Sequence, residues 1–250
     1  MKLFFAFLFS FFSLSQINAQ SVDVLLADAL VTERLPNEVL ALAKYKKIYG
    51  THTNNLTAVV KISELNSRIG SRENNTVKRD AYYKEAEKFA DYSLRLNPKS
   101  DIANVAKAMV IGKMSLGKPA KEKIRLAKEV KKYADIALNI NSNNYVAWHI
   151  VGRWHYELAN ISAIERAAAK VFVAAIPVGS IDKAIQYFEK ARSIAPTFTL
   201  NSLELAKAYH KAGNKTKAIA LLKELQGFAV TTDDDNYTKK LARDLIKEWQ

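Results

Sequence analysis

The sequence predicts an all-α fold built from antiparallel helix pairs. Glycine and proline are scarce, with 8 and 5 residues in a chain of 250, and they fall at the ends of periodic segments, where short turns join helices. Apolar residues recur at spacings of three and four, for example over residues 35–49 and 81–96. No alternating run of the kind that marks a strand is present. Together these patterns predict helices along the whole chain.

Residues 1–19 have the pattern of a secretory signal peptide. Lys2 supplies a positive charge, Leu3 to Phe12 is an apolar run interrupted only by Ser10, and Ala19 is a small residue suited to cleavage. The apolar run is shorter than the roughly 20 residues that a transmembrane helix needs. We therefore expect an exported protein, with an uncleaved anchor as the alternative.

The composition also bears on the compartment. The chain has no cysteine, which excludes disulfides, thiolate metal sites and cysteine nucleophiles. It carries Asn-x-Ser/Thr sequons beginning at Asn55, Asn74, Asn160, Asn214 and Asn236, and a glycan at Asn160 would fall within a helical stretch. We therefore expect a bacterial protein that is periplasmic or secreted.

Several helices end in the same way, which indicates a repeat. Residues 93–98, 137–142 and 191–196 each close an apolar helix with a proline or Asn-Ser sequence, which stops the helix and turns the chain. The last repeat is the most regular. With Thr199 as position 1, Ala206 lies on its first helix, Gly213 in the turn and Ala218 on its second helix. This pattern is typical of a tetratricopeptide repeat.

The remaining segments complete a tetratricopeptide-like α-solenoid of three to five helix pairs. A third repeat begins near Tyr145, and residues 160–180 form an insertion with a helix over 161–175. The preceding repeat has a long second helix over 119–139, and residues 233–249 form a C-terminal capping helix with acidic residues in its first turn. Residues 20–75 are helical but only loosely repeat-like. The predicted domains are therefore 1–19, 20–75 and 76–250.

The sequence Gly152-Arg153-Trp154-His155-Tyr156-Glu157-Leu158-Ala159, followed by Glu165-Arg166, resembles the G-R-W-x-Y-E-x-A pattern and later E-R pair of the regulator of microtubule dynamics family. Residues 195–196 and 231–235 are similar as well, and the resemblance runs from about Tyr82 to the end. It implies a helical-repeat scaffold with a non-enzymatic, interaction-type role. A role at microtubules is not expected of an exported bacterial protein.

Two opposite charge pairs lie in this motif. Arg153 and Glu157 are four residues apart on one helix, and Glu165 and Arg166 begin the insertion and could fold back onto them. Because a buried charge needs a partner, we predict a structural ion-pair lock formed by these residues. The alternative is a catalytic role centred on Glu157 as a general base, but no nucleophile or metal set accompanies it.

A second candidate site is a peptide-binding groove. In tetratricopeptide superhelices the concave surface is lined by positions 2, 5, 9, 12 and 13 of each first helix. The residues predicted to line the groove are His149, Arg153, Tyr156, Lys207, His210 and Lys211. Such a surface could hold an acidic segment or a C-terminal carboxylate. A plain solvated face is the alternative, and Arg153 cannot serve both the groove and the lock.

The formal net charge of +13 favours acidic partners. Its lysines are dispersed over nearly every helix, so a solvated basic surface also accounts for it. Peripheral binding to an anionic membrane remains the alternative function. Nucleic acid is disfavoured, because the aromatic residues occupy packing positions. No phosphate loop, dinucleotide fingerprint or H-E-x-x-H motif is present, so we expect no cofactor and no metal.

Overall fold

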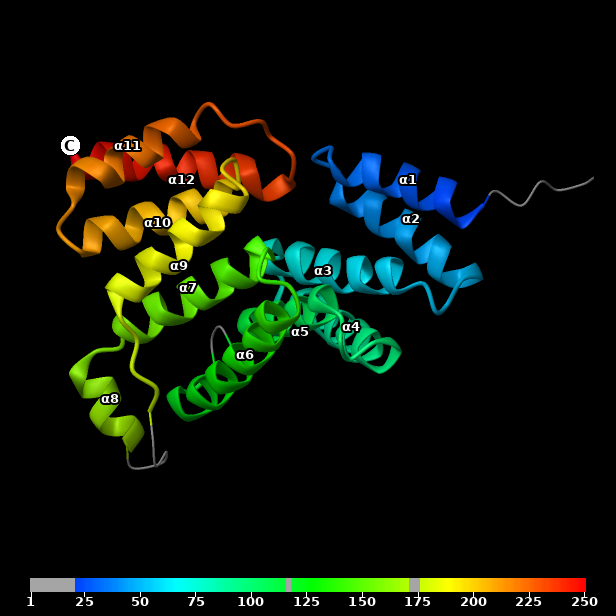
Figure 1. Ribbon diagram of the computed structural model, residues 1–250, viewed down its shortest axis with the longest axis horizontal. Helices are drawn as coiled ribbons and strands as arrows, with labels where there is room; N and C mark the ends of the chain where they lie inside the picture. Colours follow the sequence, from blue (N-terminus) through cyan, green and yellow to red (C-terminus); the bar gives the residue numbers. More distant parts are fainter. Residues whose placement is uncertain (1–20, 116–117, 171–175) are drawn as a thin grey trace, which may run out of the picture.

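The computed structural model describes residues 21–115, 118–170 and 176–250, and every regular element within them is an α-helix (Figure 1). The predicted signal segment lies outside these residues. The helices are α1 (Val22–Glu33), α2 (Glu38–Thr51), α3 (Leu56–Arg72), α4 (Thr76–Leu96), α5 (Asp101–Met114), α6 (Ala120–Ile140), α7 (Tyr145–Ala159), α8 (Ala163–Lys170), α9 (Ile181–Ile194), α10 (Thr199–Lys211), α11 (Lys215–Leu225) and α12 (Asp233–Trp249). No helix in the described part of the chain combines the length and apolarity needed to span a membrane.

Short polar side chains set the starts of these helices. In each case a side-chain oxygen at the N-cap accepts a hydrogen bond from the backbone N–H three residues later, which satisfies one of the free donors of the first turn. The N-caps of this kind are Asn37, Asn55, Asn75, Ser100, Asn144, Ser180 and Asn214. The asparagines of two sequons, Asn55 and Asn214, are therefore occupied in helix capping.

The helices pair as a tetratricopeptide-like fold requires. The pairs are α3 with α4, α5 with α6, α7 with α9, and α10 with α11, and the first helices α3, α5, α7 and α10 lie side by side. The α1–α2 hairpin packs on α3, and α12 packs on α10 and α11. Four pairs fall within the predicted range. The predicted boundary between residues 75 and 76, however, falls inside the first pair, between α3 and α4.

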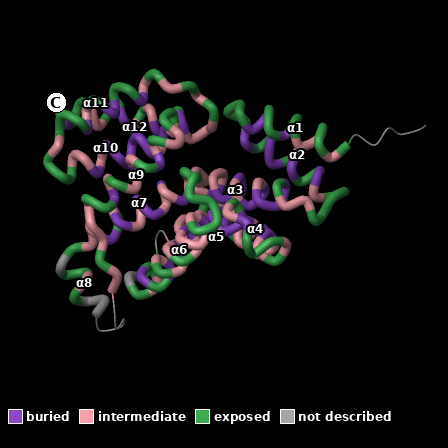
Figure 2. Tube along the Cα trace, in the orientation of Figure 1, coloured by how far each residue is buried: buried purple, intermediate pink, exposed green. Residues whose placement is uncertain are grey.

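Small residues let the paired helices approach closely. An added Cβ on Gly152 of α7 would come within 2.6 Å of the Phe188 ring on α9, so only glycine fits there. Around this contact, Ala184, Phe188, Leu205 and Leu222 are fully buried. Figure 2 shows the buried residues following the helix interfaces from one end of the chain to the other. The core is therefore a series of hydrophobic clusters between successive helices, as expected of a solenoid.

The insertion is attached firmly at its base. Its helix, α8, covers part of the predicted 161–175, of which residues 171–175 lie outside the described structure. The guanidinium of Arg166 donates from Nη2 to the Leu158 carbonyl at 2.9 Å and from Nη1 to the Pro177 carbonyl at 3.4 Å. A Cβ on Gly179 would lie 2.3 Å from the Ala159 nitrogen, so the returning chain also runs directly against α7.

Charged residues join the two ends of the solenoid. Glu38, at the start of α2, is completely buried and accepts hydrogen bonds from Arg68 and Arg72 of α3. The backbone N–H of Glu38 also donates to Asp233 Oδ2 at 3.2 Å, and Arg72 Nη1 lies 2.5 Å from Asp234 Oδ1. In Figure 1 the first turn of α12 accordingly lies beside the α1–α2 turn. We call these five residues the end clasp.

Candidate binding site on the inner face

The repeat register brings a set of mostly charged side chains to equivalent places. The first helices of the four pairs begin at residues 56, 101, 145 and 199, so their ninth and thirteenth residues share a face in neighbouring repeats. These residues are Glu64 and Arg68 on α3, Met109 and Lys113 on α5, Arg153 and Glu157 on α7, and Lys207 and Lys211 on α10. We call this set the inner face, because these positions line the concave side of a tetratricopeptide superhelix.

On α7 and α10, the inner face holds a chain of alternating charges. Arg153 Nη2 donates to Glu157 Oε1 at 2.8 Å, and Lys207 Nζ donates to Glu204 Oε1 at 3.1 Å. Burial opposes the charge on Arg153, but Glu204 and Glu157 outweigh that effect and raise its pKa. Burial likewise opposes ionisation of Glu204, and Arg153 and Lys207 reverse this and lower its pKa. Two of the predicted groove residues, Arg153 and Lys207, are therefore already coupled to Glu204.

The four-residue lock predicted from the sequence is wrong. Arg153 and Glu157 do pair, but Glu157 is exposed and the pair lies along the surface of α7. Glu165 instead accepts hydrogen bonds from the backbone nitrogen and the hydroxyl of Ser162, at 2.9 and 2.8 Å, and so closes a capping box at the start of α8. Arg166 docks the insertion through backbone carbonyls. Backbone acceptors at the base of the insertion thus replace the expected carboxylate.

Two histidines predicted to line the groove face other helices. His149 is only 4% exposed, and its Nδ1 donates to Asn201 Oδ1 at 3.1 Å while the ring packs on Phe188 and Phe198. It therefore lies beneath the inner face, and its prediction as a groove contact is wrong. His210 stacks on Trp249 of α12, with ring centroids 3.8 Å apart, so the capping helix covers one face of its ring.

The other two predicted groove residues differ in their surroundings. Tyr156 is half-buried and packs against the core formed by α9, α10 and α11. Burial raises the pKa of its hydroxyl, and the nearby Glu204 adds to the effect, so the side chain stays neutral. Lys211 is exposed, at the thirteenth position of α10. Of the predicted groove residues, Arg153, Tyr156, Lys207 and Lys211 thus keep some accessible surface on this side of the fold.

Comparison with known protein families identifies the family of this chain. The family model described as Regulator of microtubule dynamics protein 1-3 matches residues 20–250. The chain belongs to this family. Regulator of microtubule dynamics protein 1 of Bos taurus is 29% identical over 164 residues, which are 65% of this chain and 52% of that protein. Its namesake in Caenorhabditis elegans is 30% identical over 135 residues, 53% of this chain and 60% of that protein. The resemblance predicted from the sequence is confirmed, and the chain spans about half the length of the curated relatives it matches.

Solved structures support the fold of this family member. A crystal structure of a thermophilic TPR protein from Thermus thermophilus aligns with a TM-score of 0.65, covering 89% of this chain and 99% of that one at 12% identity. This likeness confirms the tetratricopeptide-like α-solenoid. The G-R-W motif has structural contacts of its own in this chain: Gly152 meets Phe188, and Trp154 Nε1 donates to the Ala127 carbonyl at 2.8 Å.

One inner-face residue of this family member was missed by the sequence reasoning. Lys113, the thirteenth residue of α5, is half-buried, and it has no hydrogen bond or ion pair to any residue that the structure describes. Burial lowers the pKa of its amine; Asp234 opposes this, while Arg153, Arg72 and Arg68 lower the pKa further. The sequence does contain the information needed to find Lys113, because the Asn97-Pro98 stop sets Asp101 as position 1 of this repeat.

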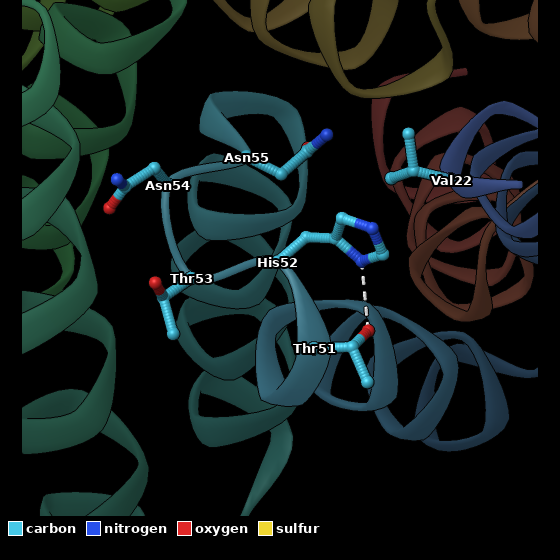
Figure 3. A pocket seen from close by; sticks show the side chains of 6 residues that line it. All are labelled: Val22, Thr51, His52, Thr53, Asn54 and Asn55. Atoms are coloured by element: carbon cyan, nitrogen blue, oxygen red, sulfur yellow. Dashed lines mark hydrogen bonds between the residues drawn. The ribbon is translucent and has the colours of Figure 1, made fainter.

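A shallow depression elsewhere on the protein has few groups suited to binding or catalysis. It lies at the turn between α2 and α3, where residues 51–55 face Val22 (Figure 3). Thr51 Oγ1 and His52 Nδ1 are hydrogen-bonded at 2.8 Å, and the Asn55 side chain is used to cap α3. No charged residue lines the depression, and nowhere among the described residues does a group of three or more histidine, aspartate or glutamate side chains come together to hold a metal ion. We therefore place the candidate site on the inner face.

Proposed function

We propose that this chain is a non-enzymatic scaffold of the cell envelope that binds a segment of a protein partner on its inner face. The observation that carries the proposal is the register of the four first helices, which places charged side chains at two equivalent positions on α3, α7 and α10 and at one of them on α5. Concave surfaces of this kind are where solenoid proteins bind extended partners. The export pattern of residues 1–19 supports the envelope setting.

The charges of the inner face favour an acidic partner. Arg68, Lys113, Arg153, Lys207 and Lys211 are its cations, and its own acidic members are Glu64 and Glu157. Carboxylates of a bound segment would form charge-assisted hydrogen bonds, which are shorter and stronger than neutral ones. The excess of basic residues over the whole chain would also speed the approach of such a partner.

The test is in-cell crosslinking followed by affinity recovery of the protein and its partners. The wild type is compared with a Lys207→Glu/Lys211→Glu variant and with a control, Lys46→Glu/Lys47→Glu, which makes the same charge change on the exposed side of α2. We expect a partner that the wild type and the control recover and the inner-face variant loses. Because Lys207 is paired with Glu204, Lys211→Glu alone serves as a second variant in which folding is not challenged. Equal recovery by all variants would contradict the proposal.

A second candidate function, contact with an anionic membrane surface, has one observation in its favour. The insertion exposes two aliphatic side chains, Ile164 at 83% and Val178 at 76%, and its helix α8 contacts the lysine-rich α6. Apolar side chains beside basic ones suit the surface of an anionic bilayer. Flotation with phosphatidylglycerol vesicles tests it: Ile164→Glu/Val178→Glu should abolish binding, and Val77→Glu, changed at an equally exposed valine on α4, should not.

A further inference from the structure

The inner face contains one half-buried cation that has no ion pair or hydrogen bond to a described residue. At the thirteenth position of each first helix stand Arg68, Lys113, Glu157 and Lys211. Arg68 is bound to Glu38, and Glu157 is bound to Arg153. Lys211 is exposed, so water solvates its amine. Lys113 alone among the four is both half-buried and without an ion pair or hydrogen bond to a described residue.

The surroundings of Lys113 make its positive charge unfavourable unless a partner of opposite charge is present. A charge removed from water is stabilised only by a partner of opposite sign or by hydrogen bonds. The cations that act on Lys113 come from both neighbouring helices, Arg68 and Arg72 on α3 and Arg153 on α7. The carboxylate that acts most strongly on it, Asp234, is already held by Arg72. The charged side chains that act on Lys113, at the middle of the solenoid, are therefore already paired with other residues.

We propose that Lys113 is the point at which the inner face binds a single carboxylate of an acidic peptide segment. This inference rests on the proposed function and names the chemistry that its site selects. The neighbouring guanidiniums are engaged, Arg68 and Arg72 by Glu38 and Arg153 by Glu157, so one unpaired positive charge remains. One carboxylate matches that charge. A doubly charged phosphate would add a second negative charge close to Asp234.

The first readout is stability without any ligand. Lys113→Met keeps the length of the side chain and removes an unpaired charge, so we expect its Tm to be higher than that of the wild type. Lys211→Met, the matched change at an exposed lysine in the same repeat position of α10, should leave the Tm unchanged. A lower Tm for Lys113→Met would show that the amine already has a stabilising partner within the chain, and would overturn the inference.

The second readout is binding of a fluorescein-labelled peptide of six glutamates, with six glutamines as the uncharged control. We expect Lys113→Met to weaken binding of the glutamate peptide at least 10-fold and Lys46→Met, the same change at an exposed lysine of α2 outside the inner face, to weaken it less than 3-fold. The glutamine peptide should bind none of the proteins. Loss in Lys207→Glu/Lys211→Glu but not in Lys113→Met would leave the proposed function standing and overturn this inference. No binding to the wild type would overturn it as well, while partner recovery in cells would still decide the proposed function.

A third readout separates carboxylate from phosphate. Lysines labelled with ¹³C-methyl groups give one resonance each, and the Lys113 resonance is assigned by its loss in Lys113→Met. We expect acetate and the glutamate peptide to shift this resonance and to raise the pKa of the amine. Inorganic phosphate acting at a concentration lower than acetate would assign the site to a phosphate group instead and would overturn the carboxylate proposal.

Discussion

Arg72 and Asp234 are 162 residues apart in the sequence, and their side chains meet with Nη1 and Oδ1 separated by 2.5 Å. Arg72 ends α3, whereas Asp234 lies in the first turn of α12, so this contact joins the first helix pair to the capping helix. The same guanidinium also binds Glu38, which is fully buried. The end clasp thus combines a buried carboxylate with carboxylates that remain partly exposed.

The clasp predicts unequal effects of two similar changes. Glu38→Ala leaves Arg68 and Arg72 without their buried partner, and we expect it to reduce the free energy of unfolding by about 3–5 kcal/mol. Asp234→Ala removes a contact between side chains that are 28% and 29% exposed, and should cost at most about 1 kcal/mol. Urea denaturation at pH 7 measures both. Equal losses would show that the buried carboxylate has no special role.

Close approach of α7 and α9 at Gly152 gives a second prediction. Gly152→Ala places a methyl group 2.6 Å from the Phe188 ring, and since Phe188 is fully buried we expect a loss of about 1–3 kcal/mol in the free energy of unfolding. Gly112→Ala on α5 is the matched control, because its nearest neighbour, Val130, would lie 3.9 Å away. That change should be neutral or stabilising by up to about 1 kcal/mol. Thermal unfolding of the two variants measures both effects, and equal losses of stability would contradict the prediction.

Much of the fold could be predicted from local patterns. Thr199 and Tyr145 begin α10 and α7 as expected, and α12 spans the predicted Asp233–Trp249. These starts are visible in the sequence because the capping residues and the proline stops act over only a few positions. The start of the first pair was not found, since the turn before α3, residues 52–55, lacks the Asn-Pro or Ala-Pro stop that precedes α5 and α10.

The candidate site depends on contacts that no local pattern contains. Helical phase placed His149 on the inner face, but its ring turns to Asn201, 52 residues away. Glu38 was overlooked because its partners lie on another helix, 30 and 34 residues further along the chain. Lys113 differs, because the repeat register alone is enough to place it at the thirteenth position of a first helix. What the register could not show is that its neighbours are already paired with other residues.

The base of the insertion gives a third prediction. Arg166→Ala removes the two hydrogen bonds to the Leu158 and Pro177 carbonyls, so we expect the amides of α8 to exchange with solvent at least 10-fold faster. Glu157→Gln, which alters only the exposed pair with Arg153, should leave this exchange unchanged. Hydrogen exchange followed by mass spectrometry measures both. Faster exchange in Glu157→Gln would instead support the predicted ion-pair lock, in which Glu157 holds the insertion.

The buried histidines give a fourth prediction, a loss of stability in mild acid. Burial lowers the pKa of His149 from 6.5 to about 4, and the charge of Arg153 adds to this; burial also lowers the pKa of His155 to about 4, with Lys183 and Lys131 contributing. Both residues are neutral in the folded protein at pH 7. The unfolded chain takes up protons once the pH falls below 6.5, whereas the folded chain takes them up only near pH 4. Stability is therefore fully present above pH 6.5 and declines through this window.

Between pH 7 and pH 5.5 the expected loss is roughly 1 kcal/mol for each of the two histidines. Urea denaturation at a series of pH values measures it, and carboxylates contribute little above pH 5.5 because their ordinary pKa values are about 4. His149→Gln/His155→Gln should flatten the dependence whatever its effect on absolute stability, because glutamine does not titrate. His52→Gln, at an exposed residue, should leave the slope as it is in the wild type. An unchanged slope in the double variant would mean that the protons are taken up elsewhere and that the buried rings are not the acid-sensitive groups of this fold.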